Sequence, residues 1–397
     1  MKKSLLIVSH ALELGGAERS LIGLLDILDP SQWEIELFLL RHEGELLGAI
    51  PAHVKLLSQI PAYTVLARPM KDTVKEGHLL LSAARLFGKA AAKRYAKKNA
   101  HTDSGVFLEY SHKYTYSLMP AIQKEKNYDL AISFLTPHYI VANKVQAKKK
   151  LAWIHTDYRQ IQVNVESEEK MWAAYDHIVS ISEAVTQGFV KVFPTLKNKI
   201  VLIENILPER LIRCEAEEVI RDMPRVSDEK ILLSVGRFCR AKNFDNIPQI
   251  CANLLRLGMN VKWYLIGFGA DEALIRQRIS EAGMQEHVIV LGKKSNPYPY
   301  IKACDLYVQP SRYEGKCVTV REAQLLGKPV IITDYATSSS QLENGEDGLI
   351  VPMDNEDCAA GIADLLYDPA RMVRLIQVCK KRDYSNSEEA QKFQMFV

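Results

Sequence analysis

The sequence predicts an α/β protein made of two doubly wound domains, each built on a parallel β-sheet. Two observations predict this fold class. Short apolar runs rich in leucine and β-branched residues recur along the 397-residue chain, as in strands that are buried on both faces. Amphipathic stretches of helix length, such as residues 17–28 and 272–282, separate most of these runs.

The apolar runs fall into two series, and each series is long enough for one sheet. The first series comprises residues 5–9, 35–40, 54–57, 130–134, 151–154, 178–181 and 200–203. The second series comprises residues 231–235, 261–266, 288–291, 306–309, 330–333 and 349–351. Each run is followed by a turn or a helix-like stretch, so the strands of a series are expected to lie parallel.

A charged stretch with two prolines and no strand-like run, residues 207–229, separates the two series. We therefore expect an N-terminal domain over residues 1–205 and a C-terminal domain over residues 206–380. The last segment, 381–397, is expected to pack back on the N-terminal domain. The two sheets are expected to face each other across a cleft, with ligands bound at the carboxyl ends of strands.

Composition excludes several classes of protein. The chain has 51 Lys and Arg against 48 Asp and Glu, and this net charge of +3 argues against a dedicated nucleic-acid binder. Its seven cysteines are scattered and have no zinc-site or paired spacing, which fits a reducing, cytoplasmic setting. No long apolar run predicts a signal peptide or a transmembrane helix, and no D-x-D motif or His/Asp/Glu cluster predicts a metal site.

Glycines and charged residues follow several of the expected strands. Gly15 and Gly16 follow the first strand and open a helix, where they form either an anion site or an ordinary turn. Gly236, Arg237 and Lys242 follow the strand at 231–235, and the two cations suit a diphosphate unless they belong to a solvated loop.

Two further strand ends predict contacts with a nucleotide base. Gly267 and Gly269 follow the strand at 261–266, and residues 294–298 follow the strand at 288–291. The glycines would let the backbone approach the base, and the segment that starts at Lys294 would close one side. Turn-forming glycine and proline explain the same residues as well.

Two glutamates lie eight residues apart after the strand at 306–309. Residues 318–326 are expected to form a helix that Gly327 ends, with Glu314 just before it and Glu322 inside it. Eight helical residues span roughly 12 Å, close to the distance between the two sugars of an extended nucleotide-sugar. The alternative is an ordinary helix-start acid and a surface glutamate.

Taken together, these residues resemble the retaining GT-B glycosyltransferases of family 4, which include bacterial capsule, exopolysaccharide and lipopolysaccharide enzymes. The motifs that carry the resemblance are "LELGGAERS", "AWIHTDY", "ILLSVGRFCRAKNFD", "YLIGFGADE", "PYIKACDLYVQPSRYEGKCVTVREAQLLGKPVIITD" and "NGEDGLIVP". The resemblance implies transfer of a hexose or N-acetylhexosamine from a UDP-sugar, or a GDP-sugar, to a glycan or lipid-linked acceptor. It implies no metal and no further cofactor.

The resemblance also implies roles for individual residues. Glu314 would contact the transferred sugar, Glu322 the ribose hydroxyls, and Arg237 and Lys242 the diphosphate. The full donor set is Gly15, Gly16, Gly236, Arg237, Lys242, Gly267, Lys294, Gly315, Lys316, Cys317 and Glu322. His155 would lie near the donor sugar as a fourth catalytic residue beside Glu314, Arg237 and Lys242, or else cap local backbone, and Asp157 would lie on the acceptor side.

The chain departs from the family pattern at two places. Ser338, Ser339, Ser340 and Gln341 follow the strand at 330–333, where many members have a glycine pair. Lys316 stands where many members have an aromatic residue, and its ammonium reaches the diphosphate or points to solvent. A nucleotide-sugar epimerase on the same scaffold and a non-catalytic partner subunit are the competing interpretations.

The segment from Arg68 to Lys98 combines basic residues with an apolar stripe. Leu80, Ala84, Phe87 and Ala91 alternate there with arginines and lysines. Such a helix lies on an anionic membrane surface or packs on a core with a solvated basic face. Any membrane contact of this chain is therefore expected to be peripheral and to serve a lipid-linked acceptor.

Overall fold

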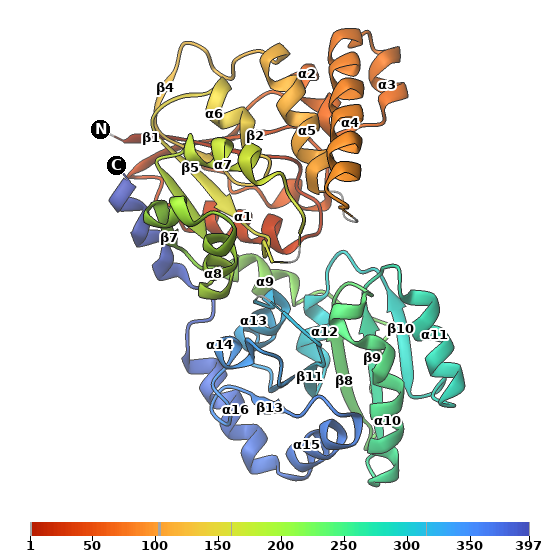
Figure 1. Ribbon diagram of the computed structural model, residues 1–397. Helices are drawn as coiled ribbons and strands as arrows, with labels where there is room; N and C mark the ends of the chain where they lie inside the picture. Colours follow the sequence, from red (N-terminus) through yellow and green to blue (C-terminus); the bar gives the residue numbers. More distant parts are fainter. Residues whose placement is uncertain (1, 102–104, 160, 315, 397) are drawn as a thin grey trace. The chain divides into compact units, whose positions relative to one another are not determined.

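The computed structural model describes residues 2–101, 105–159, 161–314 and 316–396 (Figure 1). The chain forms two compact units, which are described separately. Unit 1 comprises Met1–Ile206 and Asn386–Val397, and unit 2 comprises Leu207–Ser385. The chain therefore leaves unit 2 after Ser385, a few residues later than the end predicted at residue 380, because Tyr384 is buried in the core of unit 2.

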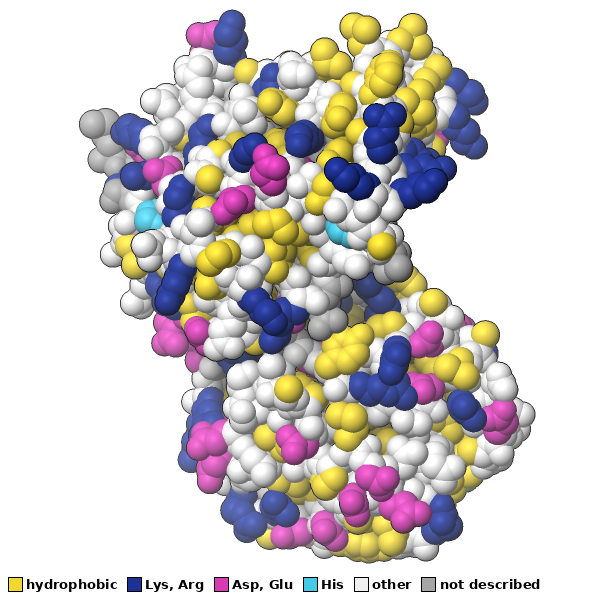
Figure 2. Space-filling model, in the orientation of Figure 1, with side chains coloured by type: hydrophobic (Ala, Val, Ile, Leu, Met, Phe, Trp, Pro, Cys, Tyr) yellow, Lys and Arg dark blue, Asp and Glu magenta, His cyan; other side chains and the backbone are white. Residues whose placement is uncertain are grey.

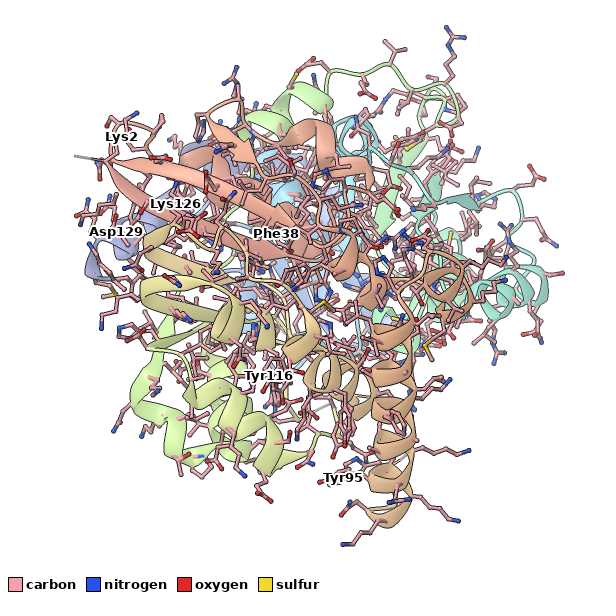
Figure 3. The ribbon with its side chains drawn as sticks, turned by 90° about the horizontal axis from the view of Figure 1, so that it is seen from above. Lys2, Phe38, Tyr95, Tyr116, Lys126 and Asp129 are labelled. Atoms are coloured by element: carbon pink, nitrogen blue, oxygen red, sulfur yellow. The ribbon has the colours of Figure 1, made fainter. Side chains whose placement is uncertain are left out.

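Unit 1 contains a seven-stranded sheet with the order β3-β2-β1-β4-β5-β6-β7, and all of its paired strands are parallel. The strands are β1 (Lys3–Ser9), β2 (Trp33–Leu39), β3 (Val54–Leu56), β4 (Asn127–Ser133), β5 (Gln146–Ile154), β6 (His177–Ser180) and β7 (Ile200–Leu202). Hydrogen-bonded polar residues lie at the amino ends of the strands, where Figure 3 labels Lys126 and Asp129. Asp129 accepts hydrogen bonds from the Ser4 backbone at 2.8 Å and from Lys148 Nζ at 2.6 Å.

Most helices of unit 1 connect these strands, and η7 belongs to the C-terminal segment that returns to the unit. They are α1 (Gly16–Ile27), η1 (Glu45–Ala49), α2 (Pro61–Thr64), η2 (Val65–Ala67), α3 (Met70–Lys75), α4 (Leu79–Lys98), α5 (Gly105–Thr115), η3 (Tyr116–Leu118), α6 (Tyr139–Lys144), α7 (Val165–Ala173), α8 (Glu183–Val192), η4 (Pro194–Lys199) and η7 (Ser387–Phe396). Asn164 and Ser182 cap α7 and α8 by accepting hydrogen bonds from backbone N–H groups in the first turn. Among the described residues no helix is both long and apolar enough to cross a membrane.

Unit 2 contains a six-stranded parallel sheet with the order β10-β9-β8-β11-β12-β13. The strands are β8 (Lys230–Val235), β9 (Val261–Ile266), β10 (Val288–Gly292), β11 (Leu306–Gln309), β12 (Val330–Thr333) and β13 (Leu349–Val351). The helices are α9 (Glu209–Glu215), η5 (Arg240–Lys242), η6 (Phe244–Asn246), α10 (Ile247–Arg256), α11 (Glu272–Glu281), α12 (Tyr298–Ala303), α13 (Val318–Leu325), α14 (Ser338–Gln341), α15 (Asn355–Tyr367) and α16 (Pro369–Lys381).

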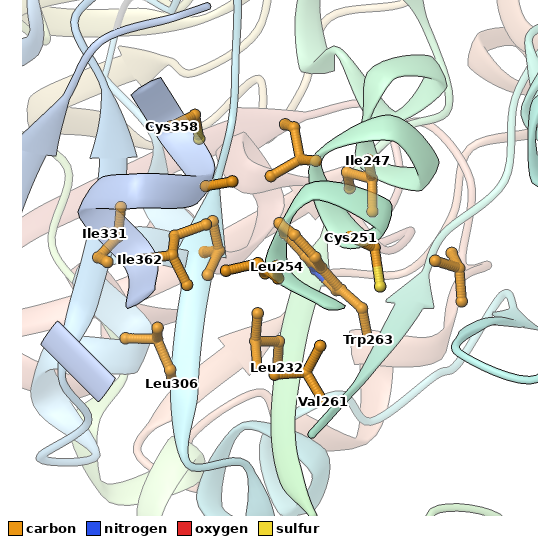
Figure 4. Packing of buried hydrophobic residues seen from close by; sticks show 14 of the residues in the cluster. Leu232, Ile247, Cys251, Leu254, Val261, Trp263, Leu306, Ile331, Cys358 and Ile362 are labelled. Atoms are coloured by element: carbon orange, nitrogen blue, oxygen red, sulfur yellow. The ribbon is translucent and has the colours of Figure 1, made fainter. Parts of the chain in front are cut away.

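One face of the unit 2 sheet carries an apolar core against α10 and α15 (Figure 4). Trp263 lies at its centre and is fully buried, and its indole N–H donates to Ser234 Oγ at 2.9 Å. The core therefore buries the large indole ring while its N–H group keeps a hydrogen-bond partner. All predicted strands overlap an observed strand, and the predicted fold class is confirmed.

In both sheets the strand order reverses beside the first strand of the unit. In unit 1 the reversal lies between β1 and β4, and in unit 2 it lies between β8 and β11. The connections on the two sides of such a point diverge and leave room for a ligand at the carboxyl ends of the strands. These two places are where functional side chains are to be sought.

Candidate functional site

The strand reversal of unit 2 brings together a cation and a carboxylate that lie far apart in sequence. Lys242 in η5 follows β8, and Glu314 follows β11. The Lys242 ammonium lies 2.6 Å from Glu314 Oε1, and the two side chains are only 18% and 12% exposed. Ser311 Oγ donates to the same carboxylate oxygen at 2.5 Å. Two residues predicted from strand ends therefore form one nearly buried ion pair.

Cys317 extends this cluster on the side of α13. Lys242 Nζ also donates to Cys317 Sγ at 3.6 Å. Burial disfavours the ammonium, but the Cys317 sulfur and the Glu314 carboxylate more than offset it and hold the pKa of Lys242 above its ordinary value. Burial raises the pKa of the Cys317 thiol. The Lys242 ammonium therefore stays charged at neutral pH, paired with the Glu314 carboxylate.

Glu322 lies inside α13 and is fully buried. The hydroxyl of Tyr298, from α12, donates to Glu322 Oε1 at 3.0 Å. The interpretation of Glu322 as a surface glutamate is therefore wrong. Tyr298 was expected only as the end of a segment beside a nucleotide base, and its contact with Glu322 was not foreseen.

The serine-rich segment after β12, which includes α14, supports the main chain of this site. Gln341 accepts a hydrogen bond from the Cys317 backbone N–H at 2.6 Å and donates to the Cys317 carbonyl at 3.2 Å. Thr337 Oγ1 donates to the Glu314 carbonyl at 2.7 Å. This segment thus holds the residues around Glu314 through the side chains of Thr337 and Gln341, and the Cys317 N–H is already engaged. Gly315 lies outside the described residues.

Close backbone packing requires a glycine at position 267, and Gly236 leaves room for the Lys242 side chain. A Cβ atom on Gly267 would lie 1.9 Å from the Gly236 carbonyl oxygen. A Cβ atom on Gly236 would lie 3.3 Å from the Lys242 side chain. These glycines let the β8 and β9 ends approach each other beside Lys242, whatever they contribute to ligand binding.

The remaining predicted cations of unit 2 differ in exposure and surroundings. Arg237 is exposed after β8, and Lys316 is half-buried. Lys294 pairs with Asp222 at 2.5 Å and lies over the ring of Tyr300. The structure thus gives Lys294 a carboxylate partner that the sequence did not indicate.

An open hollow of about 630 Å³ lies at the ends of β12 and β13. It is lined by Asp334, Tyr335, Ala336, Ser338, Ser339, Asn344, Ile350, Val351 and Pro352. The Tyr335 hydroxyl is buried without a hydrogen-bond partner among the described residues, and burial raises the pKa of this hydroxyl. Hydroxyl, carboxylate and amide groups in such a hollow suit a polyhydroxylated ligand.

The predicted residues of unit 1 lie at the ends of β1 and β5. Gly15 precedes α1, and a Cβ atom there would lie 2.1 Å from the Glu18 carboxylate, so the missing side chain makes room for that group. Gly16 is the first residue of α1. Asp157 is held by Arg159 at 2.8 Å, an ion pair that the sequence analysis did not anticipate.

His155 belongs to a set of four histidines in unit 1, of which His112 and His138 are buried and His10 and His155 are half-buried. His10 follows β1, His138 follows β4, and His112 from α5 stacks on His10 with ring centroids 5.5 Å apart. Burial lowers the pKa of His10 to about 4 and that of His155 to about 3, so both rings are neutral at pH 7. Sequence reasoning identified only His155, although His10 stands at a strand end and could have been found by the same rule.

Some buried histidine nitrogens lack a partner among the described residues. They include Nε2 of His10 and Nε2 of His155. Unpaired polar atoms are costly to bury, so they mark a place where a ligand would supply hydrogen bonds. Among the residues that the structure describes, no group of three or more His, Cys, Asp or Glu side chains is arranged to hold a metal ion.

Most of unit 2 is similar to a known family of domains. Residues 215–382 match the family described as glycosyl transferases group 1. One curated relative is N-acetylgalactosamine-N,N'-diacetylbacillosaminyl-diphospho-undecaprenol 4-alpha-N-acetylgalactosaminyltransferase of Campylobacter jejuni, 30% identical over 142 residues, or 35% of this chain and 38% of that protein. Another is the lipopolysaccharide core biosynthesis mannosyltransferase LpsB of Rhizobium meliloti, 34% identical over 101 residues, or 24% and 29%. The matched regions thus span less than half of these relatives.

Solved structures resemble the whole chain. HepE of Anabaena, solved with UDP, has a TM-score of 0.64 at 15% identity and covers 100% of this chain and 99% of its own. A mutant of TarM from S. aureus, solved with Fondaparinux, alpha-GlcNAc-glycerol and UDP, has a TM-score of 0.68 at 13% identity and covers 99% of both chains. At such low identity these likenesses concern the fold, and they support the predicted GT-B class.

Proposed function

We propose that the chain, whose residues 215–382 match the family of glycosyl transferases group 1, is a cytoplasmic, retaining glycosyltransferase of bacterial surface polysaccharide synthesis. The donor is a nucleoside-diphosphate sugar, with UDP preferred over GDP, and the sugar is a hexose or an N-acetylhexosamine. The acceptor is a glycan or a lipid-linked saccharide. The UDP in the HepE and TarM structures and the diphospho-undecaprenol in the name of the C. jejuni relative support these assignments.

The observation that carries the proposal is the pairing of Lys242 with Glu314 beside the buried Glu322. Glu314, at the end of β11, presents a carboxylate to the hydroxyls of the transferred sugar. Glu322, oriented by the Tyr298 hydroxyl, accepts hydrogen bonds from the ribose. A buried carboxylate held by a neighbouring hydroxyl loses little further conformational freedom when it binds a diol.

In this proposal Lys242 and Arg237 bind the diphosphate. Negative charge grows on the departing diphosphate in the transition state, and cations fixed beforehand stabilise it without rearrangement. The Lys242 ammonium is nearly buried, so its charge is weakly screened there. The positive end of α13 adds about 0.3–1 kcal/mol. The protein groups supply the charge stabilisation, and no metal ion is required.

The anomeric configuration is retained because the acceptor hydroxyl attacks the sugar carbon from the same face that the diphosphate leaves. The acceptor hydroxyl forms the new bond to the sugar carbon, the bond to phosphate oxygen breaks, and the hydroxyl proton passes to the leaving phosphate. Glu314 Oε1 accepts hydrogen bonds from Lys242 and Ser311, which lowers its reactivity as a nucleophile. His155 lies near the donor sugar, and Asp157 binds the acceptor side.

Donor binding and turnover test the proposal. In a thermal-shift screen of UDP- and GDP-sugars, one donor should selectively raise the midpoint temperature. The Glu322→Gln variant should lose this stabilisation by the donor, and the surface control Glu272→Gln should keep it. Nucleotide release with acceptor should be unaffected by EDTA, and NMR should show the retained anomer. An inverted product contradicts the mechanism, epimerisation of donor alone indicates an epimerase, and binding without any turnover indicates a non-catalytic subunit.

A further inference from the structure

The exposed face of α4 in unit 1 is divided along its length into an apolar half and a basic half. Residues three, four or seven apart share a face of a helix. On the exposed face the first half carries Leu79, Leu80, Leu86 and Phe87, and the second half carries Lys93, Arg94, Lys97 and Lys98. The sequence had suggested instead an apolar stripe along the whole helix, through Leu80, Ala84, Phe87 and Ala91.

The apolar half is unusually exposed. The exposed fractions are 62% for Leu79, 76% for Leu80, 56% for Leu86 and 70% for Phe87, and Val74 on α3 adds 46%. Figure 2 shows hydrophobic side chains gathered over α3 and α4, with lysines and arginines beside them. Large aliphatic and aromatic groups that cluster on a surface mark an interaction site.

The opposite face of α4 is fixed to unit 1, so the exposed face belongs to a rigid element. Gly88 packs so closely on α5 that a Cβ atom would lie 2.8 Å from the Tyr110 carbonyl oxygen. The Thr73 and Ser82 hydroxyls join α3 to α4 at 2.9 Å, and Arg85 donates to the Arg68 carbonyl at 2.9 Å. Figure 3 shows α4, where Tyr95 is labelled, running out from the sheet of unit 1.

The charges around this face are predominantly positive. Lys71, Lys75 and Lys89 are exposed beside the apolar half. The acidic groups on the same segment are Asp72 and Glu76, and Glu76 is paired with Arg68. From Leu80 to Lys97 the helix extends roughly 25 Å. The apolar side chains and the cations can therefore contact one extended anionic surface at the same time.

We propose that the exposed face of α4 docks the protein on an anionic lipid bilayer. Leu79, Leu80, Leu86 and Phe87 enter between the headgroups, while the cations of the second half bind lipid phosphates. An apolar entry point combined with a basic contact fits a charged bilayer, because a protein partner would need a matching acidic and apolar surface. The inference does not depend on the proposed catalytic activity.

The buried tryptophans of the chain give a direct test of insertion. All four, at positions 33, 153, 172 and 263, are at most 6% exposed. Phe87→Trp therefore adds an exposed indole, whose emission should shift to the blue and be quenched by brominated lipids in vesicles of phosphatidylcholine and phosphatidylglycerol. The matched control is Tyr367→Trp, at a position in unit 2 that is 63% exposed, and its indole should be unaffected.

Vesicle sedimentation tests the two halves separately. Each of Lys93→Gln and Lys97→Gln should lower the partition coefficient roughly fivefold at low salt. Leu80→Ser with Phe87→Ser should lower it at least tenfold. Lys197→Gln and Val219→Ser, at exposed positions elsewhere, should leave it unchanged, and circular dichroism checks folding. Absence of vesicle binding, equal binding to pure phosphatidylcholine, or a change of oligomeric state in place of lipid binding would overturn the proposal.

Discussion

Breaking the Lys242–Glu314 ion pair should destabilise unit 2 by much more than the loss of a surface ion pair. Lys242→Met leaves a carboxylate that is 12% exposed with the Ser311 hydroxyl but without its ammonium. Removing one partner of a fully buried pair costs about 3–5 kcal/mol, and the residual exposure of this pair reduces the expected cost to about 2–3 kcal/mol. For a unit of this size the midpoint temperature should fall by about 5–10 °C.

A double-mutant cycle measures the interaction itself. The double variant Lys242→Met/Glu314→Gln has lost both charges, so it should be at least as stable as the less stable single variant. The coupling free energy between the two residues should be about 1.5–2.5 kcal/mol. The control cycle, Arg276→Met with Glu272→Gln, removes a pair that is 56% and 37% exposed, and should give a coupling of at most about 1 kcal/mol. Calorimetry and urea unfolding of the full chain without nucleotide provide the values.

The pH dependence of this cycle has a definite sign. Because the folded-state pKa of Lys242 is raised, the stability that Lys242 contributes is complete below its unfolded-state pKa of about 10.4 and is lost as pH rises through the folded-state pKa. The difference between wild type and Lys242→Met should therefore be constant from pH 6 to 9. If the stability losses of the two single variants were additive, or if Lys242→Met were as stable as wild type, the pair would not act as a buried charge pair.

Three further predictions concern other parts of the structure. Tyr298→Phe removes the hydrogen bond to Glu322 and should lower the stability of unit 2 by about 1–3 kcal/mol and raise KM for the donor, whereas an unchanged urea midpoint would contradict it. Burial raises the pKa of Glu168 to about 7, so the free energy of unfolding of unit 1 should fall by up to about 3 kcal/mol as pH rises from 5 to 8. Urea unfolding of Glu168→Gln should not show this fall. Gly267→Ala places a methyl group 1.9 Å from the Gly236 oxygen and should cost at least about 3 kcal/mol or prevent folding; wild-type unfolding would refute the packing argument.

The fold could be predicted from sequence because parallel strands buried on both faces produce a continuous apolar run. The same rule located Lys242 and Glu314, since the carboxyl ends of parallel strands meet at one edge of a sheet. Proximity along the chain could not show that the two residues pair, because 72 positions separate them. Their contact depends on the order β8-β11, in which strands distant in sequence are neighbours.

Other features were beyond sequence reasoning because their signal is a long-range contact. The pairing of Lys294 with Asp222 joins residues 72 positions apart, and no local pattern announces it. The hydrogen bonds between Gln341 and the Cys317 backbone turn an apparent departure from the family pattern into a support of the site. The stacking of His10 on His112 likewise needs α5 to pack against the β1 end.

The return of the chain to unit 1 has a consequence for the order in which the protein is completed on the ribosome. Phe393 stacks on Trp153 of β5, and Phe396 contacts the ring of His177 in β6, so η7 fills part of the core of unit 1. These residues are synthesised after all of unit 2. Although unit 1 is translated first, it therefore exposes an unfilled apolar surface until the ribosome has passed residue 396, and it becomes complete only after unit 2 has had time to fold.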